Sequence, residues 1–567
     1  MAKGPRPVNA WSTLALRVGV AMLSHRNKIT GESPMRHLLL AATALIAAPL
    51  AAQSVDRDMV NKIIDQGTNQ SQVMQIAQHM TDVIGPRLPN SPQMREAERW
   101  AQEKFREMGL KNVRADGFEF GRGWSIERSS VRMVTPRPIQ LRAIPIAWTP
   151  ATSGPLTAPI VVAPMTEEED FAKYRGQLSG KIVLVTHPGQ PSDPTEAAFK
   201  RYTGDELSKL DAFQQPTHDP EAANTRLKRM DYTRKRDAFL KAEGAVAWAQ
   251  MARRDGGLLH GEGYLYKTND VNSLPGVEIA QEDYRRLTRL ARSGAAPSLE
   301  IVSDVKYHDD NPTAYNIIAE IPGTDAGAGY VMAGAHYDSW VGGDGAVDNA
   351  AGSAVVMEAA RILVASGARP KRTIRFVLWN AEEQGLHGSF AYVDKYMASR
   401  PPETDPAKAQ IDQYYTWGSR WPITPKPGFR DMAAYFNLDN GSGKIRGIYA
   451  ENNPAVVPIF KEWLAPFGAM GASTVAIRRT GGTDHVFMQQ IGAPGYQFIQ
   501  DPLDYGARAH HTSIDTYDRL RAEDMRQNSV IMASFLLNAA NADKALPRPP
   551  MPQRPVPTDP FAWPKDD

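Results

Sequence analysis

Apolar residues recur with two different spacings along the C-terminal half of the chain. Short runs rich in β-branched and aromatic residues predict strands, and the segments between them repeat apolar residues every three or four positions, which predicts helices. The expected strands are 314–321, 330–336, 373–380, 432–439, 473–479 and 494–500, and the expected helices are 350–366, 388–397, 454–468 and 517–540. Because strands that are apolar throughout are buried on both faces, this alternation predicts an α/β fold with a mainly parallel mixed sheet flanked by helices.

Helical spacing also dominates residues 54–110. Trp100, Phe105 and Met108 fall on one helical face, with charged residues between them. Such a stripe indicates helices that pack against a core. A short strand is expected to follow at 111–120.

Residues 126–306 have a different pattern, which predicts a β-rich module. The runs that indicate a strand, or a strand next to a helix, are 154–164, 180–189, 236–251 and 274–294. Gly and Pro bound these runs, as is typical of strands. A polar stretch at 189–232 interrupts the module, and we expect an extended excursion with helical parts there.

The two ends of the chain differ from the rest. A basic head after Met35, an apolar stretch at 38–48 and small residues up to Ala52 are typical of a signal peptide at 35–52. We interpret residues 1–34 as a mis-called start; the alternative for this end is an N-terminal membrane anchor. The tail at 544–567 is rich in proline, which favours an extended or disordered end.

Composition narrows the possible functions. The chain has 567 residues, so more than one domain is expected. Its net charge is only +2, which gives no electrostatic case for a nucleic-acid partner. It has no cysteine, so thiolate chemistry and cysteine zinc sites are excluded. The apolar run in the predicted signal is too short for a permanent membrane span, so export to the periplasm or outside the cell is expected.

Acidic and histidine side chains follow four of the expected strands. They are His336, Asp338, Asp344 and Asp348 after the second strand, Glu382 and Glu383 after the third, Asp439 after the fourth, and Asp501, Asp504, His510 and His511 after the last. Ligands of open α/β sheets bind at the carboxyl ends of the strands, so we expect these side chains to meet. Imidazoles and carboxylates without cysteine suit Zn²⁺ or a similar divalent ion. Two such ions could share a hydroxide during hydrolysis of an acyl bond.

Five motifs make the resemblance to a family specific. They are "AHYDS" with "AVDNAAG", "NAEEQGLHGS", "NLDN", "GGTDHVFMQQIGAPG" and "HHTSIDT". Together they resemble the zinc aminopeptidase and carboxypeptidase family, which includes bacterial leucyl aminopeptidases, carboxypeptidase Q and glutamate carboxypeptidase II. The resemblance implies a zinc exopeptidase fold formed by residues 53–125 and 307–543. It also implies that 126–306 is an inserted protease-associated domain.

The resemblance assigns roles residue by residue. It implies two Zn²⁺ ions, although another divalent metal is compatible, held by His336, Asp348, Glu383, Asp439 and His511. Asp348 would bridge both ions, with a cis peptide bond to Asn349. Glu382 would be the general base, and the carboxylate of Asp338 would orient the imidazole of His336. His510 stands where several relatives have an oxyanion-stabilising Tyr, and its N–H could do the same work.

Several functions stay open within this family. We expect an exported di-zinc exopeptidase that acts on peptides or dipeptides, most simply an aminopeptidase or dipeptidase. The alternatives are an enzyme like carboxypeptidase Q or glutamate carboxypeptidase, a glutaminyl cyclase-like transferase, and a non-catalytic receptor-like member. A carboxypeptidase needs cations for the substrate carboxylate, for which Arg478 or Arg479 is a candidate. A homodimer is compatible with these features.

Overall fold

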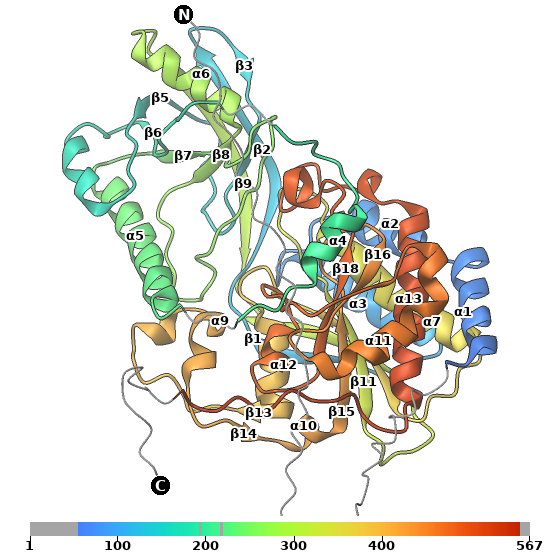
Figure 1. Cartoon of the computed structure of the whole chain (residues 1–567). Coiled ribbons are helices and arrows are strands. Elements are labelled where there is room, and N and C mark those ends of the chain that lie inside the picture. The colour runs from blue at the N-terminus through green and yellow to red at the C-terminus, as the bar shows by residue number, and fades with distance from the viewer. Residues whose placement is uncertain (1–54, 192–194, 216–218, 556–567) are drawn as a thin grey trace, which may run out of the picture. The chain divides into compact units, whose positions relative to one another are not determined.

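The structure is a computed structural model that describes residues 55–191, 195–215 and 219–555 (Figure 1). All of them belong to one unit of the chain, residues 52–567. The predicted signal peptide at 35–52 and the segment 1–34 lie outside the described residues, as does the end of the proline-rich tail. In the part of the chain that the structure describes, no helix has the length and apolar character needed to cross a bilayer.

The first sheet has eight strands in the order β1-β10-β12-β11-β15-β18-β16-β17. Its strands are β1 (Lys111–Glu119), β10 (Thr313–Ile321), β11 (Tyr330–His336), β12 (Thr373–Trp379), β15 (Met432–Asn437), β16 (Ile445–Tyr449), β17 (Thr474–Ala476) and β18 (Gly495–Gln500). The central strands β12, β11, β15 and β18 are parallel, and antiparallel pairs join β1 to β10, β10 to β12 and β16 to β18. This confirms the predicted mixed sheet. The prediction missed β16, where Arg446 and Gly447 interrupt a short apolar run.

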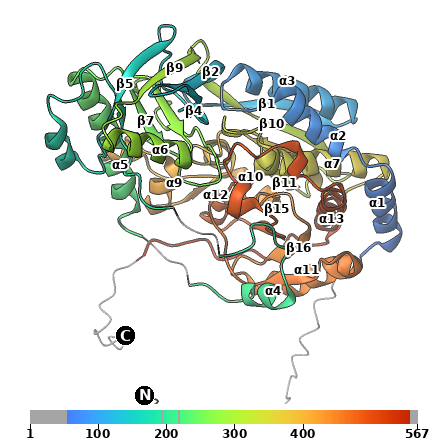
Figure 2. The same ribbon diagram turned by 90° about the horizontal axis from the view of Figure 1, so that it is seen from above.

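Helices cover both faces of the first sheet (Figures 1 and 2). Val331, Ala333 and Ala335 of β11 face one core, whereas Tyr330 and Met332 face the other, as the alternation of side chains along a strand requires. The first core is closed by α1 (Arg57–Asn69), α2 (Val73–Gln78), η1 (His79–Ile84), α3 (Pro92–Glu107), α7 (Ala351–Ala365), η7 (Pro454–Val456), α11 (Val457–Leu464), η8 (Ala465–Met470) and α13 (Ala522–Asn541). The second is closed by α8 (His387–Tyr392), η4 (Val393–Met397), α9 (Gln413–Thr416), η6 (Trp417–Ser419), α10 (Pro427–Asp431) and α12 (Val486–Gln489).

Helix α7 shows why the sequence folds in this way. It packs against both α13 and the sheet, and nearly all of its residues are buried. A helix enclosed on most sides must be apolar all round. Its one buried charge, Glu358, accepts two hydrogen bonds from Arg361 one turn later.

A second sheet is formed by residues between Gly123 and His308, in the order β3-β2-β9-β5-β6-β7-β8-β4. Its strands are β2 (Gly123–Thr135), β3 (Ile139–Gln140), β4 (Ala143–Pro145), β5 (Leu156–Val162), β6 (Ile182–Leu184), β7 (Ala247–Met251), β8 (Gly276–Ile279) and β9 (Ser298–His308). The same segment contains η2 (Glu168–Tyr174), α4 (Gly204–Leu210), α5 (Ala222–Ala242) and α6 (Gln281–Arg292). Identifying this segment as a protease-associated domain stays a prediction.

Helix α5 begins inside the stretch that the sequence marks as a polar excursion. Helical parts are expected in this stretch, but the first half of α5 carries Arg226, Lys228, Arg229 and Asp231 in place of an apolar stripe, so periodicity does not show where the helix begins. The remaining short elements are β13 (Ala398–Ser399), β14 (Thr424–Pro425), η3 (Ala346–Ala350), η5 (Lys408–Gln410), η9 (Tyr505–Ala509) and η10 (Tyr517–Arg519).

The described part of the tail has no helix or strand, as its prolines predict. Hydrogen bonds hold it to segments around the first sheet. The carbonyl of Pro547 accepts one from the side chain of Asn453 (2.7 Å), and the guanidinium of Arg548 donates to the carbonyl of Met432.

Candidate metal centre

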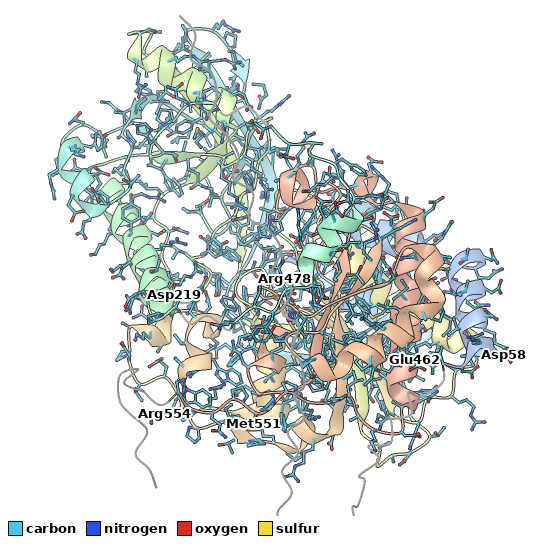
Figure 3. The ribbon with its side chains drawn as sticks, viewed as in Figure 1. Asp58, Asp219, Glu462, Arg478, Met551 and Arg554 are labelled. Carbon is cyan, nitrogen blue, oxygen red and sulfur yellow. The ribbon has the colours of Figure 1, made fainter. Side chains whose placement is uncertain are left out.

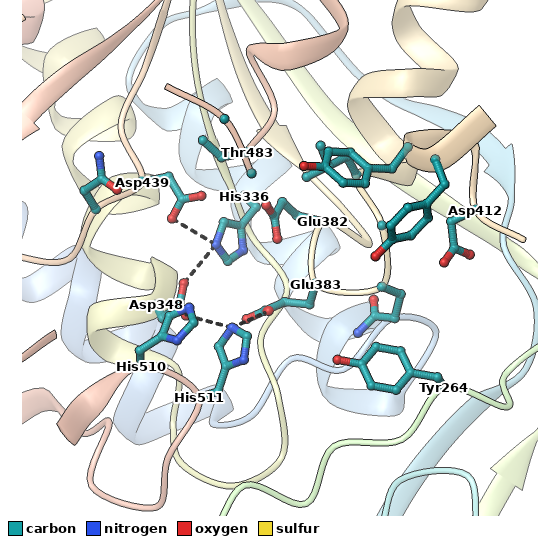
Figure 4. Close-up of a pocket in the computed structure, with 18 of the residues that line it drawn as sticks. Tyr264, His336, Asp348, Glu382, Glu383, Asp412, Asp439, Thr483, His510 and His511 are labelled. Atoms are coloured by element: carbon teal, nitrogen blue, oxygen red, sulfur yellow. Dashed lines mark hydrogen bonds and ion pairs between the residues drawn. The ribbon is translucent and has the colours of Figure 1, made fainter. Parts of the chain in front are cut away.

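Four parallel strand ends deliver their polar side chains to one place (Figure 4). His336 ends β11, Glu382 and Glu383 follow β12, and Asp439 follows β15. The pair His510–His511 follows β18, and His511 has a φ of 61°, which is unusual for a residue other than glycine. The strand ends therefore meet, but Asp501 and Asp504 do not join the cluster. Asp501 pairs with Arg201 and Arg446, and Asp504 pairs with Arg519.

Asp348 lies between two imidazoles. Its Oδ1 is 3.1 Å from Nε2 of His336, and its Oδ2 is 3.3 Å from Nε2 of His511. The same nitrogen of His336 is 3.3 Å from Oδ1 of Asp439, and that of His511 is 2.8 Å from Oε2 of Glu383. The carboxylate of Asp348 thus presents one oxygen to each of two histidine–carboxylate pairs.

The backbone around Asp348 is fixed from both sides. The Asp348–Asn349 peptide bond is cis, as the resemblance implies. The amides of Val347 and Asp348 donate to the carboxylate of Asp515, at 2.5 and 3.1 Å. Asp515 holds the loop that carries Asp348 without facing either histidine. It stands in the quoted "HHTSIDT" motif, but sequence reasoning gave it no role.

Arg87 holds the preceding part of the same loop and was also missed. Its guanidinium is fully buried and donates to the carbonyls of Tyr337 (2.8 Å), Asp344 (2.9 Å) and Gly345 (2.8 Å). An arginine that satisfies several backbone carbonyls fixes a loop that has no regular hydrogen bonding of its own. Asp344 contributes its backbone and stays without a chemical role.

The structure differs from the expectation for Asp338. Nδ1 of His336 donates to the backbone carbonyl of Asp338 (3.0 Å), whereas the carboxylate is 3.8 Å from that nitrogen. The carboxylate instead accepts the amides of Glu382 (3.1 Å) and Glu383 (3.3 Å). Asp338 therefore positions the glutamate pair, because its side chain reaches the turn after β12 and its own carbonyl is closer to the imidazole.

His510 packs beside the other histidine. The rings of His510 and His511 stack with centroids 3.7 Å apart, and Nε2 of His510 is 3.6 Å from Oδ2 of Asp348. Burial lowers the pKa of His510 to about 4, so its imidazole is neutral at pH 7. Its nitrogen can therefore either ligate a metal together with Asp348 and His511 or face a substrate.

Crowded carboxyl groups repel one another at this site. Burial, with Asp439 and Asp484 nearby, raises the pKa of Glu382 well above its ordinary value. Burial raises the pKa of Glu383 to about 7, and Asp348 contributes to the rise. These directions describe carboxylates that lack a compensating cation.

The donor set fits zinc. Oδ2 of Asp348 and Oε1 of Glu383 are buried and accept no hydrogen bond from the described residues. Histidine nitrogens and carboxylate oxygens are ligands that zinc prefers when cysteine is absent. A divalent cation would give these oxygens a partner and offset the repulsion between the acids.

Residues from three distant segments line one further side of the pocket, whose volume is about 460 Å³. We call this group the far wall: Arg226, Tyr264, Asp412, Tyr414 and Tyr415. Figure 4 shows Tyr264 and Asp412 on the side of the pocket away from Asp348 and Asp439. Arg226 donates to Asp412 (3.0 Å), and its guanidinium lies 4.8 Å from the Tyr264 ring centre. Sequence patterns gave no signal for this wall.

The two candidate arginines and two further histidines do not line the pocket. Neither Arg478, labelled in Figure 3, nor Arg479 is among the described residues that line it. Nε of Arg479 donates to Gln489 (3.0 Å). His485 is buried against Thr480, and burial lowers its pKa to about 3. His387 is bonded to Tyr266 (2.8 Å) and supports the loop behind the far wall.

Fold and site together indicate a metal-dependent hydrolase, and comparisons with known proteins match part of the chain to a peptidase family. Residues 316–536 match the model of Peptidase family M28. Carboxypeptidase Q of Mus musculus is 25% identical over 83% of this chain and 86% of its own length. Leupeptin-inactivating enzyme 1 of Streptomyces exfoliatus is 32% identical over 33% of this chain and 36% of its own.

Solved structures share the fold. A peptidase M28 precursor from Shewanella amazonensis has a TM-score of 0.60 and 23% identity, covering 87% of this chain and 99% of that one. A zinc aminopeptidase from Bacillus subtilis has a TM-score of 0.53 and 19% identity, covering 84% and 97%. Residues 316–536 therefore form a region that matches Peptidase family M28, and the protein is a metallopeptidase.

Proposed function

We propose that this protein is an exported di-zinc exopeptidase that releases terminal residues from peptides or splits dipeptides, as an aminopeptidase or dipeptidase. The observation that carries the proposal is the position of Asp348, which presents one carboxylate oxygen to His336 and the other to His511. A carboxylate placed in this way can bridge two ions ~3.5–4 Å apart. Export rests on the predicted signal peptide at 35–52.

Five residues would hold the metals. His336 and Asp439 would bind one ion, His511 and Glu383 the other, and Asp348 both. Zinc in such a site polarises the scissile carbonyl and lowers the pKa of water. The buried oxygens of Asp348 and Glu383 that lack hydrogen bonds support this assignment.

Glu382 is the proposed general base. Its amide is held by Asp338, and its carboxylate lines the pocket beside His336 and Asp439. It would take a proton from the attacking water as the water oxygen bonds to the carbonyl carbon. It would then pass this proton to the amine nitrogen as the carbon–nitrogen bond breaks, which leaves a carboxylate and a free amine.

His510 is the proposed oxyanion donor. It lines the pocket, and its ring is neutral at pH 7 because burial holds its pKa at about 4. A neutral imidazole has one N–H to offer, and a donor aimed at the developing oxyanion stabilises the transition state.

A carboxypeptidase is the second candidate, and Arg226 is the observation that favours it. A guanidinium in the far wall could bind the carboxylate at the end of a peptide. Arg226 is already paired with Asp412, however, so the charge it can offer to a substrate is reduced. For this reason we place the aminopeptidase or dipeptidase first.

The test is a substrate panel run on the purified protein with and without a strong chelator. Aminoacyl-nitroanilides report aminopeptidase activity, and unmodified dipeptides report dipeptidase activity. A peptide blocked at its C-terminus cannot be cleaved by a carboxypeptidase, so its hydrolysis would exclude that alternative. Peptides with N-terminal Gln report cyclisation. We expect hydrolysis that stops on chelation and returns with zinc. Activity that survives complete metal removal would contradict the proposal.

A further inference from the structure

One loop of the second sheet reaches the proposed metal centre from outside the peptidase motifs. It follows β7 and contains Glu262, whose Oε1 is 2.8 Å from Nδ1 of His511. Nε2 of the same ring faces Glu383 and Asp348. The two ring nitrogens thus point to two different regions of the chain, and Glu262 lies 249 residues before His511 in the sequence.

The position of Glu262 is itself fixed. Arg253 donates to both of its oxygens, at 2.6 and 2.5 Å. Gly263 lets the loop pass close to the second sheet, because a Cβ there would lie 2.1 Å from the carbonyl oxygen of Ala147. His260, two residues before Glu262, donates its backbone amide to the side chain of Glu278 of β8 (2.6 Å). Glu262 is therefore held in one place before any ligand binds.

The same loop is bonded to the backbone around His511. The amide of Ser513 donates to the carbonyl of Leu259 (2.8 Å), and Ser513 Oγ accepts from the amide of Leu259 (3.2 Å). Arg254 donates to the carbonyl of His510 (2.6 Å). The contact at Glu262 is thus one of several that join the two loops.

We propose that Glu262 is a positioning residue for the metal ligand His511, so that the segment carrying the second sheet completes the zinc site. The proposal rests on the assignment of His511 as a ligand. A carboxylate on the outer nitrogen of a ligating imidazole fixes the tautomer, orients the ring and makes the inner nitrogen a stronger donor.

The two ligand histidines are then held in different ways. Nδ1 of His336 is bonded to a neutral carbonyl two residues away in the same strand end. Nδ1 of His511 is hydrogen-bonded to the carboxylate of Glu262, in the segment that carries the second sheet. The ion bound by His511 therefore depends on Glu262, and the ion bound by His336 does not.

The test measures zinc affinity by chelator competition on the full-length protein, alongside zinc content and thermal unfolding. Glu262→Gln keeps a hydrogen-bond acceptor but removes the charge, and Glu262→Ala removes both the acceptor and the charge. We expect the affinity for the ion held by His511 to fall by about 10- to 100-fold, more for Ala than for Gln. Glu300→Gln is the control, because Glu300 also pairs with an arginine, Arg132, but has no hydrogen bond or ion pair with a histidine among the described residues. Its zinc affinity should equal that of the wild type.

A second pair of variants covers loss of folding. If Glu262→Gln fails to fold, Glu262→Asp is compared with Glu262→Asn, which have the same length and differ only in charge. The carboxylate variant should bind zinc more tightly. Equal zinc affinities of the wild type and Glu262→Gln, or of Glu262→Asp and Glu262→Asn where the second pair is needed, would overturn the proposal. Failure of the proposed function has a different result: His511→Ala would then retain the zinc content and affinity of the wild type.

Discussion

The strand ends of the first sheet and the segment that carries the second sheet contribute to the same pocket, but they supply different residues. The strand ends supply the proposed ligands and the proposed base, within motifs that stand directly after apolar strands. The other segment supplies Arg226 from a charged helix and Tyr264 from a loop, neither within a motif. Glu262, from the same loop, supports the pocket from behind. The difference suggests that chemistry resides on the strand ends, and that the second segment sets substrate contact and ligand orientation.

Replacing the proposed base tests the chemical side of this comparison and should have the largest effect. Glu382→Gln removes the proton acceptor, so kcat is expected to fall by about 10²- to 10⁴-fold. Zinc content should stay at the wild-type value, because Glu382 is not a proposed ligand. Glu103→Gln, an exposed glutamate of α3, is the control for the same change of charge. If Glu382→Gln keeps the wild-type kcat, Glu382 is not the general base.

His510 separates two roles on the same side of the pocket. If it stabilises the oxyanion, His510→Ala should lower kcat by about 10²-fold with little change in KM. If it ligates a metal with Asp348 and His511, zinc affinity falls as well. Steady-state kinetics and zinc titration on the same sample distinguish these results. An unchanged kcat would exclude both roles.

Arg226 tests the far wall, where a smaller effect on binding is expected. Arg226→Leu removes a cation that contacts Asp412 and Tyr264, so KM should rise about 10-fold, equal to about 1.4 kcal/mol of binding, while kcat stays within a factor of about three.

Two further variants control for side effects of that change. Arg229→Leu removes an exposed arginine one turn along the same helix and should leave KM unchanged. Combining Arg226→Leu with Asp412→Asn tests whether the rise in KM comes from leaving the Asp412 carboxylate without its partner. If Arg226→Leu lowers kcat and leaves KM as it was, the proposed division of roles between the two regions is wrong.

The smallest expected effect concerns stability behind the strand ends. Burial raises the pKa of Glu98 to about 7, although Arg95 and Asn380 donate hydrogen bonds to it. Because the folded pKa is higher than the unfolded value, the folded state binds more protons between about pH 4.5 and 7. The free energy of unfolding should therefore fall by about 1–3 kcal/mol as the pH rises through that window.

Glu98→Gln should flatten that part of the profile. The measurement is urea unfolding at about pH 5 and pH 7.5 for the wild type, Glu98→Gln and Glu103→Gln. The control should keep the wild-type slope. If Glu98→Gln also keeps the wild-type slope, the pH dependence of the free energy of unfolding arises from other acidic residues.

The first sheet and the residues at its strand ends could be predicted from the amino-acid sequence. Runs such as 330–336 and 373–380 are apolar because both of their faces are buried, and this periodicity can be seen without coordinates. Since parallel strands end at one edge of a sheet, His336, Glu382 and Asp439 could be expected to meet.

The residues that hold these side chains in place, and those that close the pocket, could be identified only in the folded chain. Glu262 stands between two glycines in a loop without periodicity, and Arg226 stands in a charged helix start, so neither position shows its contact in the sequence. Even Asp338, correctly placed near the site, binds the amides of Glu382 and Glu383 with its carboxylate and His336 with its carbonyl. The physical reason is that periodicity reports burial, whereas a hydrogen bond between distant segments depends on how their loops pack.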